Sequence, residues 1–215
     1  MKFLKKYGAV FLILGALSDF LTPYGLGLFY PGMNQGTMVI SIFGDVNSPV
    51  REAFKIWSVV SGILFVLAVP ALYAFFRKIA PRFGWLPALC IALYGICDCM
   101  FTGLFSIDQE AASWTFSTWV HNIGSGVGYA GFLLFPAVVA LVYQLVGKTR
   151  EGRVYWLFLA ASILTAILYG LARIPALAHT TVFSQLGLWQ RVSFFFNYLP
   201  ILYAGVHIYQ ARERL

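Results

Sequence analysis

Six apolar runs, each about 20 residues long, dominate this sequence of 215 residues. A run of that length crosses the roughly 30 Å hydrocarbon core of a bilayer as one α-helix. With 60% hydrophobic and only 11% charged residues, no stretch is polar enough for a separate soluble domain. We therefore predict an all-α integral membrane bundle of six transmembrane helices, one domain over residues 1–215. The expected spans are 7–30, 56–76, 83–105, 119–146, 154–175 and 187–210.

The basic residues indicate the orientation of this bundle. Six spans place both termini on one side of the membrane, and that side carries eleven of the fifteen Lys and Arg residues: Lys2, Lys5, Lys6, Arg77, Lys78, Arg82, Lys148, Arg150, Arg153, Arg212 and Arg214. Since basic residues mark the cytoplasmic side, we expect a multi-pass protein of the prokaryotic cytoplasmic (inner) membrane with cytoplasmic N and C termini. The net charge of +7 is then a topology signal. The expected partners are membrane lipids and not nucleic acid.

Polar side chains interrupt the apolar runs at the opposite, outward end. An ionisable group inside a span costs about 2.5–3.5 kcal/mol on insertion scales, so it faces the bundle interior. We predict that these residues converge on an outward-facing polar cavity that binds a lipid or a small amphiphile. Arg173 and Arg191 would hold an anionic or polar head group. The predicted ligand-binding set is Asp98, Asn122, Arg173, Arg191 and Asn197.

The stretch GLFSIDQEAASWTFSTWVHNIGSG, residues 103–126, carries the densest polar mixture between two spans. Ser117, His121 and Ser125 follow at intervals of four and share one helix face. This pattern supports an enzyme as the first alternative, a lipid hydrolase or acyl-transfer protein. His121 would be the general base, and Asp108, with Asp98, would orient it.

Two further alternatives use the charges differently. Asp19, near the middle of the first span, suits the proton or cation site of a small-molecule or ion-coupled carrier. The structural alternative pairs Asp98 with Arg173 and Asp108 with Arg191, as ion pairs that lock the bundle and bind nothing.

No cofactor is predicted. His121, Asp98 and Asp108 offer the donor types of a zinc site, but HExxH and HxxxH spacings are absent from the sequence. Cys90, Cys97 and Cys99 lie in one span, where helical spacing excludes a disulfide between them.

Two other features concern packing. Gly124, Gly126, Gly128 and Gly131 begin a span, and we expect them to allow close helix contact and not to form a nucleotide loop. The outer loop at 31–55 contains MVISIF, which is too short to span and either lies in the interface or caps the cavity.

Several short motifs resemble a prokaryotic six-helix membrane family catalogued as domain of unknown function 998. The motifs run from YPG at residue 30 through ISIFG, NSP, SGILFVL and GLFSID to GLWQR, which ends at Arg191. The resemblance implies six spans and brings no established activity. A looser similarity extends to DRAM-like proteins and to ceramidase-like hydrolases, whose zinc-binding HxxxH is missing here.

Overall fold

The computed structural model describes residues 2–214, and these contain six helical spans long and apolar enough to cross a membrane. Five spans are single helices, and the third is built from three segments in sequence. Their bounds are α1 Lys2–Gly27, α2 Arg51–Ile79, α3 Leu86–Leu93 with η2 Tyr94–Met100 and α4 Phe101–Leu104, α5 Phe116–Leu145, α6 Thr149–Ala172 and α7 Leu186–Ala211. The predicted all-α membrane bundle is thereby confirmed. α1, α2 and α6 begin about five residues before the predicted spans, because their first turns are polar and extend past the apolar run.

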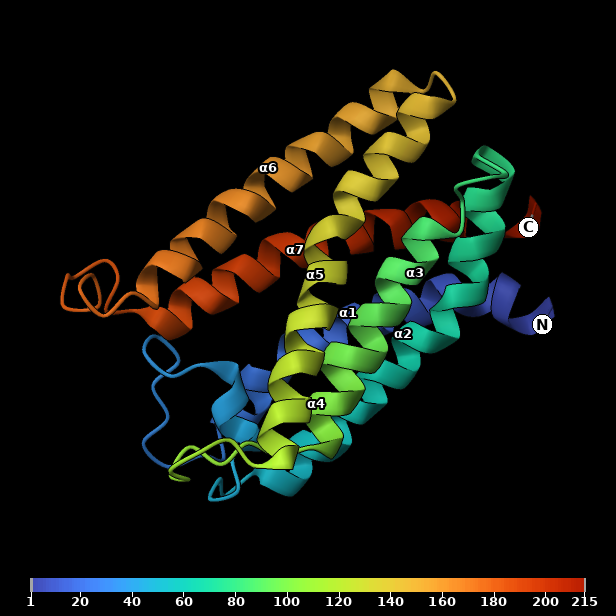
Figure 1. Cartoon of the computed structure of the whole chain (residues 1–215). Coiled ribbons are helices and arrows are strands. Elements are labelled where there is room, and N and C mark those ends of the chain that lie inside the picture. Colours follow the sequence, from blue (N-terminus) through green and yellow to red (C-terminus); the bar gives the residue numbers. More distant parts are fainter. Residues whose placement is uncertain (1, 215) are drawn as a thin grey trace.

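The chain termini and the three longer loops lie at opposite ends of the bundle (Figure 1). Both termini lie at the end with the short connections between α2 and α3 and between α5 and α6. The other end carries the three longer connections, at 28–50, 105–115 and 173–185. α6 packs mainly on α5 and α7, at the edge of the bundle.

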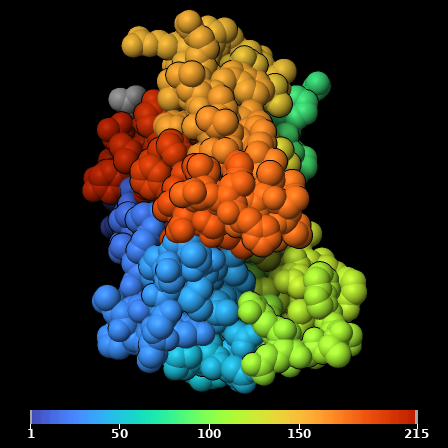
Figure 2. Space-filling model, turned by 90° about the vertical axis from the view of Figure 1, so that its left-hand side faces the viewer, coloured from blue at the N-terminus to red at the C-terminus, as the bar shows by residue number. Residues whose placement is uncertain are grey.

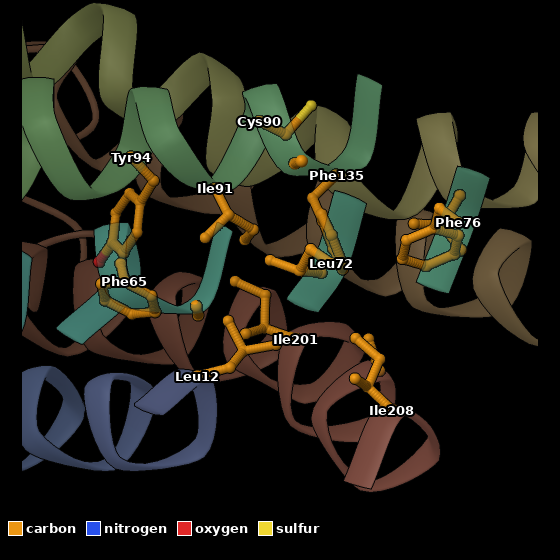
Figure 3. Close-up of a cluster of buried hydrophobic side chains, with 14 of the residues drawn as sticks. Leu12, Phe65, Leu72, Phe76, Cys90, Ile91, Tyr94, Phe135, Ile201 and Ile208 are labelled. Atoms are coloured by element: carbon orange, nitrogen blue, oxygen red, sulfur yellow. The ribbon is translucent and has the colours of Figure 1, made fainter. Parts of the chain in front are cut away.

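A dry apolar core fills the half of the bundle nearer the termini. Figure 3 shows side chains from α1, α2, α3, α5 and α7 packed against one another. Leu12, Leu72, Ile91, Phe135 and Ile201 have no exposed surface. This layer lies beyond the depth of Asp19, toward the termini.

Glycines bring α5 close to the third span, as predicted. A Cβ added to Gly124 would lie 2.6 Å from the Cys97 carbonyl oxygen, and one at Gly131 would lie 2.8 Å from that of Cys90. A Cβ on Gly128 would overlap the backbone and Cβ of Asp98. The expectation is wrong for Gly126, which has open space around it. Gly124, Gly128 and Gly131 are spaced by four and three residues and therefore share one face of α5, whereas Gly126 lies on another face.

The third span changes its winding where the polar residues lie. Residues Tyr94–Met100 form η2, a π-helical segment in which hydrogen bonds join residues five apart. Gly62 of α2 and Gly95 of η2 meet here, since a Cβ on Gly62 would lie 2.5 Å from the Gly95 carbonyl oxygen. The wider turn brings Tyr94, Asp98 and Cys99 toward the bundle interior. Such π-helical turns are rare and frequent at functional sites.

The first long loop, residues 28–50, folds over the loop end of the bundle. It contains η1, a 3-10 turn at Ile40–Gly44. Leu188 N–H donates to Gly36 O at 2.7 Å, which ties the loop to the start of α7. Val46 N–H donates to Ile107 O at 2.9 Å, which ties it to the loop after α4. Figure 2 views this end, with segment 28–50 in blue against the orange start of α7 and beside the yellow-green 105–118 segment.

Candidate functional site

Asp19 is the centre of a hydrogen-bonded group formed by three spans. Its Oδ2 accepts from the hydroxyls of Tyr94 of η2 and Tyr198 of α7, the latter at 2.8 Å. The two tyrosine oxygens lie 3.0 Å apart. The Cys99 thiol also points to the same oxygen, at 3.6 Å. Tyr94 and Tyr198 are buried, so the bundle fixes the orientation of the Asp19 carboxyl group.

Asp98 and His121 lie on the wall of the same cavity as Asp19. Asp98 is 7% exposed and neighbours the Ser125 hydroxyl of α5. His121 Nδ1 lies 2.7 Å from the Phe105 carbonyl oxygen. Because a carbonyl only accepts, Nδ1 carries the hydrogen, and this bond fixes the orientation of the ring. Asp98 and His121, which the sequence places at one depth, thus line one cavity.

The cavity is small and partly closed by the first long loop, residues 28–50. Its volume is about 70 Å³. Roughly 10–15 Å³ of such space is needed for one water molecule, so there is room for about five waters or one small head group, and not for an acyl chain. Ile40 and Ser41 of η1 line it. Ile40 N–H donates to Gln190 Oε1 at 2.7 Å, and Gln190 also lines the cavity. Of the two roles predicted for this loop, the structure supports capping.

The charge of the cavity is one-sided. Asp19 and Asp98 line it, and among residues 2–214 no lysine or arginine does. Aromatic rings contribute much of the remaining wall: Phe54, Tyr94, Phe194 and Tyr198. Two carboxyl groups therefore share an aromatic cavity with the His121 side chain, and no lysine or arginine of residues 2–214 lines it.

The predicted interhelical ion pairs are wrong. The ion pairs within residues 2–214 lie on exposed surfaces and join Lys6 and Arg212 to Glu213, and Arg51 and Lys55 to Glu52. Asp98 and Asp108 belong to none of them. The physical reason is the position of α6 at the edge of the bundle, which carries Arg173 away from η2.

The two predicted ligand-binding arginines have different surroundings. Arg173 is exposed at the end of α6, where its guanidinium lies 4.8 Å from the Tyr169 ring centre and donates to the Tyr169 hydroxyl. Arg191 is only 4% exposed. Its Nη1 donates to Met38 O at 2.8 Å and to Gly187 O at 2.9 Å. Arg191 lies beside the cavity, in a small adjoining pocket that also contains Asp19.

The structure does not bring the other predicted site residues to the cavity. Asp108 Oδ1 accepts from the Glu110 and Ala111 N–H groups, each at 3.1 Å, so it closes a turn of the loop at 105–115. Asn122 follows His121 on α5 but is not among the described residues that line the cavity. Asn197 is fully buried and its Nδ2 donates to Ser193 O at 2.8 Å.

The predicted catalytic pair is consequently split. His121 faces the cavity, whereas the Asp108 carboxylate is held in the loop. Ser117, at the start of the same helix face, donates to Ser106 O at 2.7 Å. Ser125 alone of the predicted hydroxyls shares the cavity with His121. Residues 2–214 contain no group of three or more His, Cys, Asp or Glu placed to hold a metal ion, and the three cysteines are free thiols.

Sequence reasoning missed Tyr94 and Tyr198 as partners of Asp19. One signal was available, because both tyrosines occur in the middle of apolar runs, away from the interfaces where tyrosine is usually enriched. Their convergence on one carboxyl oxygen depends on the π-helical turn of η2, which no periodicity in the sequence indicates.

A family model described as "Protein of unknown function (DUF998)" matches residues 13–207. The match covers most of the chain and all six spans in whole or in part. The chain is therefore a multi-pass membrane protein with a helical bundle, and it belongs to the DUF998 family. No curated protein and no solved structure matches it.

Proposed function

We propose that this protein binds a small amphiphile through a cationic head group held in the cavity between Asp19 and Asp98. The observation that carries the proposal is the one-sided charge of this cavity: two carboxyl groups line it, and no lysine or arginine of residues 2–214 does. The proposal keeps the amphiphile expected from the sequence but reverses the charge of the head group in this cavity.

Electrostatics favours a cationic occupant. A carboxylate removed from water is costly unless a charge of opposite sign pairs with it, and inside a membrane such a group takes a proton or a cation. An ammonium group provides three N–H donors for carboxyl oxygens. It is also attracted to the faces of aromatic rings, and Phe54 and Phe194 add such rings beside Tyr94 and Tyr198.

The dimensions favour an amphiphile over a free ion. The cavity of about 70 Å³ suits a head group. An open groove of about 300 Å³ lies outside it, between the loop ends of α1 and α7. Phe20, Leu188, Val192 and Phe195 make most of that groove apolar, which suits a hydrocarbon chain.

The enzyme and carrier alternatives have less support. An enzyme built on His121 with both Asp98 and Asp108 needs these side chains to meet. Asp98 lines the cavity with His121, but Asp108 is held in a loop turn. A carrier needs a path from Asp19 to the end that bears the termini. The fully buried layer of Leu12, Leu72 and Ile201 fills that part of the bundle, which favours binding over transport.

The proposed orientation places the cavity on the outer side of a cytoplasmic (inner) membrane, with both termini in the cytoplasm. The basic residues near the termini and short connections support it. The proposed partners are therefore membrane lipids and a small amphiphile, with no role for nucleic acid.

Calorimetric titration of the purified protein in mild detergent tests this function. The probe is hexylammonium, with hexanol and hexanoate as uncharged and anionic analogues. We expect saturable binding of hexylammonium only. Asp19→Asn and Asp98→Asn are each expected to weaken it at least about tenfold, which corresponds to about 1.4 kcal/mol.

Asp108→Asn is the matched control, because it makes the same substitution outside the cavity. Its affinity for hexylammonium should equal that of the unsubstituted protein. The proposal would be contradicted by equal affinities for hexanol and hexylammonium. It would also be contradicted if Asp19→Asn, Asp98→Asn and Asp108→Asn lowered the affinity for hexylammonium equally.

A further inference from the structure

Arg191 is a buried cation whose charge is only partly satisfied by the protein. Arginine has five N–H donors, and Nη1 uses its two on Met38 O and Gly187 O. Nε and Nη2 are buried and have no hydrogen-bond partner within residues 2–214. Leaving donors of a charged group unpaired is expensive, more so than for a neutral group. Arg191 is therefore poised to bind an acceptor that is not part of the described chain.

The position of Arg191 connects the cavity to the groove. It lines the small pocket that it shares with Asp19, Tyr24 and Phe194. It also lines the groove of about 300 Å³ between α1 and α7. The head-group cavity and the small pocket share part of their walls, which Asp19, Phe194 and Tyr198 form. The three spaces are therefore neighbours, with the two carboxyl groups at one end, the guanidinium in the middle and the apolar groove at the other end.

Gln35 adds a second unsatisfied group at the groove. Its Nε2 donates to Pro23 O at 2.8 Å, while its buried Oε1 has no hydrogen-bond partner among the described residues. Gln35 lines the groove together with Arg191. Buried polar groups are normally hydrogen-bonded. Gln35 Oε1 can only accept, so it needs a donor from a ligand, whereas the unpaired N–H groups of Arg191 need an acceptor.

We infer that Arg191 is an anion subsite for a phosphate ester, and that the ligand is an ammonium phosphodiester amphiphile. This inference rests on the proposed function. The ammonium group would lie between Asp19 and Asp98, the phosphate on Nε and Nη2 of Arg191, and the chain in the groove. A planar guanidinium offers two parallel N–H donors to a phosphate, which is its preferred geometry.

Titration with matched probes tests the subsite. Hexylammonium carries the cation alone, hexyl phosphate the anion alone, and the mixed phosphodiester of hexanol and ethanolamine carries both on one six-carbon chain. We expect the phosphodiester to bind at least tenfold more tightly than hexylammonium. The ratio is taken within each variant, so that any change in the affinity for hexylammonium itself is divided out, and Arg191→Gln is expected to abolish this ratio.

Arg173→Gln is the control, because it removes an exposed arginine near the same end of the bundle, and its ratio should match that of the unsubstituted protein. A ratio of one in the unsubstituted protein, or a ratio that survives Arg191→Gln, would overturn the subsite. Should Arg191→Gln fail to fold, Arg191→Lys replaces it. Lysine keeps the charge without the fork, so the ratio should fall but not vanish, and an unchanged ratio would overturn the inference.

Two further results separate the inference from the function on which it rests. Binding of hexyl phosphate without any binding of hexylammonium would remove the proposed function and keep the anion subsite. Ethanolamine phosphate, which has no chain, distinguishes the sources of the phosphate. If it competes as well as the hexyl phosphodiester, the subsite stands and its ligand is a soluble phosphate ester. If ethanolamine phosphate competes at least tenfold more weakly than the hexyl phosphodiester, binding needs the hydrocarbon chain, and the phosphate is that of a lipid head group.

Discussion

The two halves of this bundle are built from the same spans but differ in what fills them. Toward the termini, α1, α2, α3 and α7 enclose apolar side chains such as Leu12, Leu72 and Ile201 with no exposed surface. Toward the loops, α1, η2 and α7 enclose Asp19, Tyr94 and Tyr198 around a cavity. Along α7, Tyr198 and Ile201 are only three residues apart, so the change from polar to apolar takes place within one helical turn.

The apolar half contains residues that stabilise the fold, whereas the polar half contains residues that lower its stability. The apolar half offers close packing, which stabilises a membrane bundle through dispersion contacts. The polar half has two carboxyl groups with no lysine or arginine of residues 2–214 beside them in the cavity wall, and an arginine with unpaired donors. Groups of this kind are costly inside a membrane and are typical of functional sites. Substitutions should therefore affect stability in one half and ligand binding in the other.

The largest expected loss of stability comes from the apolar half. Leu72→Ala should lower the free energy of unfolding by about 2–5 kcal/mol, because it leaves a cavity in a fully buried layer. Thermal unfolding in detergent measures the loss. Affinity for hexylammonium, measured well below the melting temperature, should be unchanged. A variant of normal stability and lost affinity would break the division between the halves.

The next effect concerns the contact between α5 and η2. A methyl group on Gly128 would overlap Asp98, and overpacking of this kind costs about 1–3 kcal/mol. Gly128→Ala should lower the melting temperature and weaken hexylammonium binding, since η2 must shift. Gly126→Ala is the internal control, as nothing lies within 4 Å of its added Cβ. It should be neutral or stabilising by up to about 1 kcal/mol. Equal effects of the two substitutions would contradict the packing described here.

A smaller effect is expected within the polar group itself. Tyr198→Phe removes the hydroxyl that donates to Asp19 at 2.8 Å. A hydrogen bond of this kind contributes about 0.5–1.5 kcal/mol, and up to about 3 kcal/mol when the acceptor is charged. We expect a stability loss in the lower part of that range and a several-fold weaker binding of hexylammonium by calorimetry. Tyr73→Phe is the control: its exposed hydroxyl accepts from Arg77 of the same helix, so stability should change by no more than about 0.5 kcal/mol and the affinity should be unchanged.

The smallest effect is expected at Arg173. If this arginine locked the bundle by pairing with Asp98, its removal would cost several kcal/mol. It is exposed and stacks on Tyr169 of its own helix, so Arg173→Gln should change stability by no more than about 0.5 kcal/mol. A drop in melting temperature as large as that of Leu72→Ala would return Arg173 to a structural role.

The sequence was sufficient for the spans and for part of the site. Run length predicts six helices, and the depth of the polar residues predicts that Asp98 and His121 lie near each other in the wall of one cavity. The pairings could not be predicted, because they depend on rotation about each helix axis. Asp108 lies only thirteen residues before His121, yet its carboxylate is used by its own loop. Asp19 lies in the middle of a run and becomes the centre of the site, because the π-helical turn brings Tyr94 to it.

Native mass spectrometry of protein purified in mild detergent tests the central claim most directly. It compares the unsubstituted protein with Asp19→Asn and with the control Asp108→Asn. We predict that the unsubstituted protein and Asp108→Asn retain the same amine-bearing amphiphile, and that Asp19→Asn loses it. An identical set of bound lipids in all three proteins, or a bound amphiphile without a basic nitrogen, would contradict the claim that this cavity holds a cationic head group.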